Sequence, residues 1–124
     1  MGLFSISSTK SESFPWIELT SSDQLKTAIE HSTERPILLF KHSTRCSISS
    51  MAKSRFEKNW NQENKVCDLY YLDLIAFRAI SNEIENITGV VHQSPQAILL
   101  KNKKVIYQET HSSIDASDIE KSLE

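Results

Sequence analysis

The residues of this sequence that are best suited to carry out a reaction lie in the segment TRCSISS, at positions 44–50. Cys46 is one of only two cysteines in the chain, and Ser49 follows it by three residues. If a helix begins here, its first turn leaves backbone N–H groups without helical partners and its dipole adds partial positive charge. Both features stabilise a thiolate, the nucleophilic form of cysteine. The segment predicts a reactive Cys46, with Ser49 one turn further on and able to donate a hydrogen bond to the sulfur.

Three cationic or ionisable side chains, Lys41, His42 and Arg45, precede this cysteine and add positive potential. Ser49 cannot form a disulfide, so the C-x-x-S arrangement predicts a single-thiol site. The alternative is that Cys46 is a small buried hydrophobic residue. Its polar neighbours and its place after an apolar run favour the reactive interpretation.

Cys67 serves as a comparison, because it lies inside a predicted strand between Val66 and Asp68. We expect it to be a structural core residue, since cysteine is among the most buried residue types. The alternative is that it forms a disulfide with Cys46, which needs the two Cα atoms within about 7 Å.

Pro95 lies between a predicted helix and a predicted strand. It either only ends one element before the next begins, or is a cis-proline that leaves backbone groups free beside the sulfur. His42 and His92 flank the loops that would meet at Cys46. Each is either a proton donor to the site or a loop histidine with a local hydrogen bond.

The elements that must position these residues follow from hydrophobic periodicity. Residues 36–41, PILLFK, form a short apolar run typical of a strand buried on both faces. From Cys46 onward, apolar residues recur every four positions and predict a helix to about residue 61: Ile48, Ala52, Phe56 and Trp60.

Further strands are predicted at 16–19, 66–72, 96–101 and 105–110, the last two as a hairpin. A helix over 77–87 ends at Gly89, and two capping boxes, Ser21-x-x-Gln24 and Ser117-x-x-Glu120, open two others. Strands alternating with helices predict an α/β fold, a central mixed sheet with helices on both faces.

Length and composition define the class of protein. The 124 residues suffice for one domain, which we expect at 14–124 after a flexible segment at 1–13. A net charge of −2 gives no sign of a nucleic-acid partner, and no apolar run reaches the ~20 residues of a membrane span. The scattered histidines and cysteines show no metal-ligand spacing. The N-terminal residues do not show the basic start and long apolar stretch of a secretory signal, so the expected location is the cytoplasm.

Three blocks of sequence carry a family resemblance: FKHSTRCSIS at 40–49, YYLDLIAFRAISNEI at 70–84, and HQSPQAILL at 92–100. With these blocks the chain resembles the thioredoxin-like superfamily, and more specifically the YtxJ-type monothiol bacilliredoxins of bacteria. The resemblance covers nearly all of the chain after residue 13.

The resemblance implies that Cys46 is the redox nucleophile and that Pro95 is a cis-proline facing it, after Ser94. The substrate would be a client protein whose cysteine is capped by bacillithiol, a low-molecular-weight thiol that acts as co-substrate; no bound cofactor is implied. Lys41, Arg45 and the backbone near Ser94 are the expected partners of its carboxylates.

The sequence departs from many thioredoxin-like relatives at two positions, since Ser49 replaces a second cysteine and Ser47 replaces a proline. The first departure removes the usual dithiol route. Two alternatives remain open at this point: a dithiol oxidoreductase that uses Cys46 and Cys67, and a non-catalytic module that binds partners or senses oxidants through Cys46.

Overall fold

The structure of the chain, a computed structural model, describes residues 14–61 and 66–123. The predicted flexible segment 1–13 lies outside the described residues, as do positions 62–65 and Glu124. In the part of the chain that is described, no helix is both long and apolar enough to cross a membrane.

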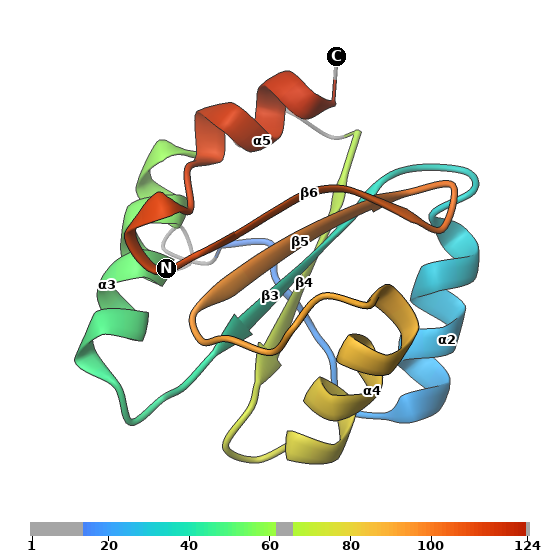
Figure 1. Cartoon of the computed structure of the whole chain (residues 1–124). Coiled ribbons are helices and arrows are strands. Elements are labelled where there is room, and N and C mark those ends of the chain that lie inside the picture. Colours follow the sequence, from blue (N-terminus) through green and yellow to red (C-terminus); the bar gives the residue numbers. More distant parts are fainter. Residues whose placement is uncertain (1–13, 62–65, 124) are drawn as a thin grey trace, which may run out of the picture.

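A single mixed sheet of five strands forms the centre of the fold (Figure 1). Its spatial order is β2-β4-β3-β5-β6, with β2, β4 and β3 parallel to one another and the β5–β6 hairpin added antiparallel to β3. The strands are β2 (Ile17–Glu18), β3 (Ile37–His42), β4 (Asp68–Asp73), β5 (Gln96–Lys101) and β6 (Lys104–Thr110). The predicted α/β architecture is confirmed.

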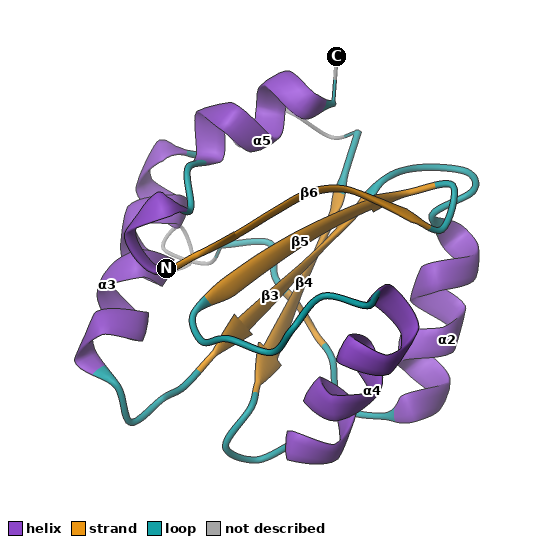
Figure 2. Cartoon of the chain, viewed as in Figure 1, coloured by secondary structure: helices purple, strands orange, loops and turns teal. Residues whose placement is uncertain are grey.

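Helices cover both faces of this sheet (Figure 2). On one face lie α2 (Ser22–His31) and α4 (Arg78–Thr88), and on the other α3 (Ser47–Asn59) and α5 (Ala116–Ser122). A short 3-10 helix that the sequence did not predict, η1 (His111–Ser113), leads from β6 toward α5.

Strand β3 is buried along its whole length, as its continuous apolar run predicted. Because side chains alternate along a strand, Ile37 and Leu39 join the core beneath α2 and α4, while Leu38 and Phe40 join the core beneath α3 and α5. The same alternation sends Lys41 toward α4 and His42 toward α3. These two neighbours therefore face opposite sides of the sheet.

Local sequence signals explain most of the element ends. Ser21 caps α2 by accepting a hydrogen bond from the Gln24 N–H, and Gly89 ends α4 in the left-handed region at φ 75°. The predicted cap of the last helix at Ser117 is wrong: Asp115 accepts from the backbone N–H groups of Ser117 and Asp118 and begins α5 two residues earlier. The Asp115 carboxylate is as good a cap acceptor as the Ser117 hydroxyl. Because Asp115 precedes Ser117 in the chain, the helix begins at the earlier of the two residues.

Candidate thiol redox site

Cys46 is the N-cap residue of α3 and is partly exposed, with a free thiol. Its carbonyl accepts the first helical bond from the Ser50 N–H at 3.0 Å, and its own N–H donates to the Ser43 carbonyl at 3.1 Å. The first turn of α3 contains no acidic residue. Cys46 therefore stands immediately before the first turn of α3 rather than within that turn, and its side chain makes no capping hydrogen bond to the helix.

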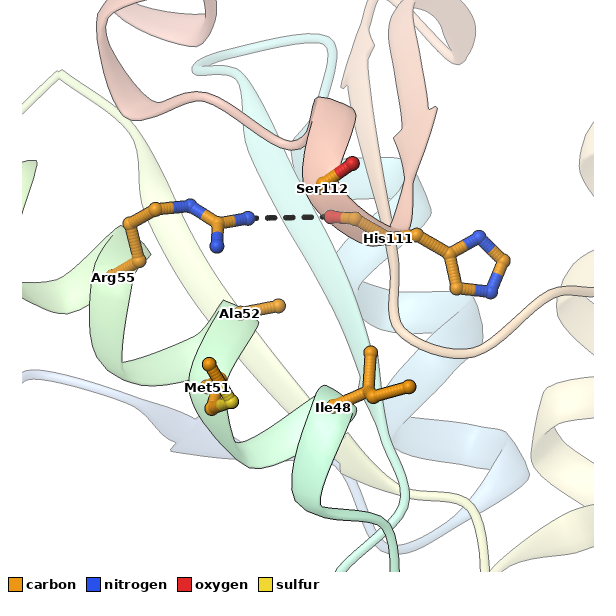
Figure 3. Close-up of a pocket in the computed structure, with 6 residues that line it drawn as sticks. All are labelled: Ile48, Met51, Ala52, Arg55, His111 and Ser112. Carbon is orange, nitrogen blue, oxygen red and sulfur yellow. Dashed lines mark hydrogen bonds between the residues drawn. The ribbon is translucent and has the colours of Figure 1, made fainter.

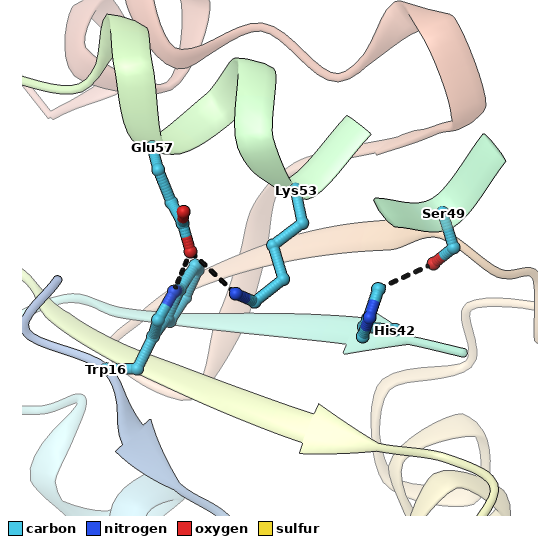
Figure 4. A network of polar contacts seen from close by, with 5 residues as sticks. All are labelled: Trp16, His42, Ser49, Lys53 and Glu57. Carbon is cyan, nitrogen blue, oxygen red and sulfur yellow. Dashed lines mark hydrogen bonds and ion pairs between the residues drawn. The ribbon is translucent and has the colours of Figure 1, made fainter. Parts of the chain in front are cut away.

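Ser49 is completely buried, and its hydroxyl joins α3 to the end of β3 (Figure 4). Its oxygen accepts from the Ser43 N–H at 3.0 Å and lies 2.9 Å from His42 Nδ1. Among the described residues, no hydrogen bond connects this hydroxyl with the Cys46 sulfur, contrary to the sequence expectation. The hydroxyl is bonded instead to the Ser43 N–H of the loop and to His42 at the end of β3. Ser49 therefore fixes the loop that leads to Cys46.

His42 lies at the end of β3, where its ring contacts the hydroxyl of Ser49. The Ser49 hydroxyl accepts from the Ser43 N–H and shares a second hydrogen bond with His42 Nδ1, in which the ring tautomer decides which of the two groups donates. Burial lowers the pKa of His42, and the nearby charge of Lys53 lowers it further. His42 is therefore a buried support of the loop.

A second polar network joins the other end of α3 to Trp16, the residue directly before β2 (Figure 4). Glu57 accepts from the Trp16 indole N–H at 2.6 Å and pairs with Lys53 at 2.7 Å. The Lys53 ammonium also lies 5.2 Å from the centre of the Tyr71 ring, within cation–π range. Both ends of the helix that carries Cys46 are therefore tied to the sheet.

The Ser94–Pro95 peptide bond is cis, as the resemblance implied. In the antiparallel pair of β3 and β5, Lys41 lies opposite Gln96, so Pro95 lies beside the end of β3 from which the chain continues to Cys46. Figure 1 shows the connection into β5 and the loop into α3 at the same end of the sheet. The Pro95 carbonyl accepts from the His111 N–H at 3.0 Å.

Two of the predicted substrate-binding residues, Arg45 and Ser94, lie at this end of the sheet. Arg45 is exposed directly before the cysteine. Ser94 is half-buried, and its hydroxyl oxygen is buried without a hydrogen-bond partner among the described residues. Their roles, and that of Pro95, stay predictions.

Lys41 is placed differently from the sequence expectation. It has no exposed surface, and its ammonium contacts the Ser81 carbonyl of α4 at 3.3 Å and His92 Nδ1 at 3.3 Å. Burial lowers its pKa to about 8. Lys41 therefore cannot meet a substrate carboxylate at the surface, because strand alternation turns it toward the face opposite α3.

Cys67 lies at the far end of the sheet, in the core beneath α3 and α5. It precedes Asp68, whose partner in the register is Ile37 at the start of β3, whereas Cys46 follows the end of that strand. The length of β3 alone separates the two positions by roughly 17 Å, beyond the ~7 Å that a disulfide spans. Burial raises the pKa of Cys67 to about 12. The dithiol alternative does not fit this geometry.

A shallow pocket of about 160 Å³ adjoins the first turns of α3 (Figure 3). The Arg55 guanidinium closes one side by donating to the His111 carbonyl at 3.4 Å. Ile48 and Met51, which line the pocket, are 60% and 67% exposed. Ile48 shares the four-residue spacing of Phe56 without sharing its burial, because residues four apart drift by about 40° per step around a helix and position 48 has turned away from the sheet.

In the described ranges, no group of three or more His, Cys, Asp or Glu side chains could hold a metal ion. The groups that the structure brings together at this end of the sheet are the partly exposed Cys46, the start of α3 that carries it, and the cis peptide bond before Pro95.

Sheet order, a cysteine opening the helix after β3, and a cis-proline at the start of β5 together define a thiol redox protein of the thioredoxin fold. A solved structure described as an oxidoreductase with a thioredoxin fold matches with a TM-score of 0.77 and 33% identity, covering 89% of this chain and 95% of the other. The family model described as monothiol bacilliredoxin BrxC matches residues 17–119, and the chain belongs to this family.

More distant structures share the fold alone. Thioredoxin from Trypanosoma brucei brucei matches with a TM-score of 0.69 and 14% identity over 89% of both chains. Thioredoxin NaTrxh from Nicotiana alata matches with a TM-score of 0.67 and 17% identity, covering 86% of this chain and 88% of the other.

Proposed function

We propose that this protein is a monothiol exchange enzyme that removes bacillithiol from mixed disulfides on client proteins. The observation that carries the proposal is the asymmetry of the two thiols: Cys46 is accessible at a helix start, while Cys67 is buried and far away. A site with one usable sulfur can accept a small thiol from a client, but it cannot close an internal disulfide.

The first step transfers the small thiol. The Cys46 thiolate attacks the bacillithiol sulfur of the mixed disulfide, a new bond forms between these two sulfurs, and the bond to the client sulfur breaks. The client leaves as a thiolate and takes a proton from solvent. Oxidation state is conserved, because one disulfide replaces another.

The second step regenerates the enzyme. The thiolate of a second bacillithiol attacks the bacillithiol sulfur held on Cys46, which gives bacillithiol disulfide and the Cys46 thiolate. The second bacillithiol is the reductant, so the cycle requires a compartment that holds this thiol in its reduced form. We place the protein in the bacterial cytoplasm on this ground.

The residues around the sulfur supply binding and orientation. Bacillithiol carries two carboxylates on its malyl group, and the exposed Arg45 guanidinium and the free N–H groups of the first turn of α3 are suitable partners. The backbone at Ser94 and Pro95 lies at the same edge and can receive the client segment next to its capped cysteine. Ser49 and His42 act indirectly, by fixing the loop that ends in Cys46.

The test is to incubate the protein with one client capped either by bacillithiol or by glutathione and to measure release of each small thiol. We expect faster release of bacillithiol, loss of release in Cys46→Ser, and normal release in the matched control Cys67→Ser. Equal loss in both variants would refute the monothiol scheme. Labelling of Cys46 without turnover would instead identify a binding or sensing module.

A further inference from the structure

A buried polar cluster lies on the α4 side of the sheet, opposite the helix that carries Cys46. It consists of Lys41 on β3, Ser81 on α4 and His92 in the connector between α4 and β5. The Lys41 ammonium lies 3.3 Å from both the Ser81 carbonyl and His92 Nδ1, and the Ser81 hydroxyl lies 3.0 Å from the same Nδ1. Lys41 and Ser81 have no exposed surface.

The direction of these hydrogen bonds follows from the groups themselves. An ammonium only donates, so His92 Nδ1 accepts from Lys41, and the Ser81 hydroxyl, 3.0 Å from the same nitrogen, shares its single lone pair as a second donor. The imidazole is therefore neutral, with its proton on Nε2. Burial, the charge of Lys41 and the charge of Arg78 all lower the pKa of His92, which agrees with this state.

The cluster holds the connector that leads to the cis peptide bond. The His92 N–H donates to Glu85 Oε1 of α4 at 3.1 Å, and the Gln96 side-chain amide of β5 donates to the Val91 carbonyl at 2.9 Å. The connector is thus fastened at His92 from α4 and β3, and at Val91 from β5. Pro95 follows His92 by only three positions.

The burial of the Lys41 ammonium is not explained by packing, because an apolar side chain would fill the same space at a lower cost in free energy. Its described hydrogen-bond partners are neutral acceptors, and the charges that act on it are Glu85, which favours its charged form, and Arg78, which opposes it. A buried ammonium without a contacting carboxylate destabilises a fold in which an apolar side chain of similar length would fit. Its presence where the connector is fastened points to a role in holding Ser94 and Pro95 in place beside the end of β3.

We propose that Lys41, with His92 as its partner, is a positioning residue for thiol exchange at Cys46, because it fixes the connector that carries Ser94 and Pro95 against the end of β3. This inference rests on the proposed function and adds to it a support on the opposite face of the sheet. Lys41 touches neither the client nor the small thiol, and it acts through the backbone that receives the client.

The experiment compares Lys41→Met, Ser81→Ala and His92→Phe with the wild type, and uses Lys26→Met on the exposed face of α2 as the matched control. For the first three variants we expect kcat/KM for release from a bacillithiol-capped client to fall at least fivefold, mainly through KM. Alkylation of Cys46 by iodoacetamide should stay within twofold of wild type, since the thiol itself is not altered. The control should match wild type in both assays.

A spectroscopic signature separates this role from general damage to the fold. In wild type, the 15N shifts of the imidazole should report a proton on Nε2 of His92 at neutral pH. Its titration midpoint should move upward in Lys41→Met, because the charge that opposes protonation is gone.

The possible failures are distinguishable. If wild type releases no bacillithiol, the proposed function fails. If wild type releases it and all three cluster variants match its kcat/KM, the positioning role is wrong. Parallel losses in release and alkylation would also contradict it, since they indicate a disturbed thiol. Should Lys41→Met not fold, Ser81→Ala and His92→Phe give the same decision.

Discussion

Replacing Lys41 by methionine should stabilise the folded chain at neutral pH, even though it removes the hydrogen bonds to Ser81 and His92. Lys41 has no exposed surface, and burial lowers its pKa from 10.5 to about 8. The difference of about 2.5 corresponds to about 3 kcal/mol by which folding disfavours the charged ammonium, at about 1.4 kcal/mol for each pKa unit. Removing the ammonium leaves His92 Nδ1 satisfied, because it still accepts from the Ser81 hydroxyl at 3.0 Å.

The sign of the pH dependence follows from proton binding. Between pH 8 and 10.5 the unfolded chain retains a proton on Lys41 that the folded chain has released, so the stability of wild type rises with pH in this window. Methionine has no such proton. The advantage of Lys41→Met should therefore be about 3 kcal/mol at pH 7 and decline toward zero as the pH approaches 10.5.

Urea denaturation of both proteins at about pH 7, 8, 9 and 10 tests this expectation. Other groups that titrate in the same range contribute equally to both proteins and cancel in the difference. The exposed Lys26→Met should leave the free energy of unfolding within about 0.5 kcal/mol of wild type at every pH. A Lys41→Met protein that is less stable at pH 7, or a gain that does not change with pH, would refute the reasoning.

Three further predictions concern the site and its support. Ser49→Ala removes a completely buried hydroxyl that joins β3 to α3, and urea denaturation should show a loss of about 1–3 kcal/mol, against little change for the exposed Ser50→Ala. Asp115→Ala should lower stability by about 1 kcal/mol at pH 7 through loss of the cap of α5. Hydrogen bonds from the Ser117 hydroxyl and N–H lower the pKa of Asp115, so this contribution is present above pH 3.8 and lost as the pH falls further; equal effects at neutral pH and in strong acid would contradict it. Because burial raises the pKa of Cys67 to about 12, iodoacetamide at mildly alkaline pH should alkylate Cys46 in the native protein and Cys67 only in urea, as intact mass would show.

The sequence carried enough information for the order of the elements and for the location of the thiol. The continuous apolar run of β3 and the left-handed end of α4 at Gly89 depend on local rules, and both are present in the structure. The position of Cys46 followed from helical spacing, because the apolar residues that recur every four positions begin directly after it. The cis bond before Pro95 could be expected only through the family resemblance.

The direction of individual side chains was harder to predict. The run PILLFK does not reveal which face Lys41 takes until the register and the helices on each face are known. Ser49 was expected to turn toward the sulfur, but the Ser43 N–H and the His42 ring compete for its hydroxyl. These hydrogen bonds depend on tertiary packing, and hydrophobic spacing does not encode them.

Mass spectrometry of the intact protein after reaction with a bacillithiol-capped client tests the central claim most directly. The monothiol account predicts one bacillithiol adduct, carried on Cys46, retained in Cys67→Ser and removed by added bacillithiol. It predicts no adduct in Cys46→Ser. A protein that instead loses two hydrogens through a disulfide between Cys46 and Cys67, or that leaves the client capped and gains no adduct, would contradict the account.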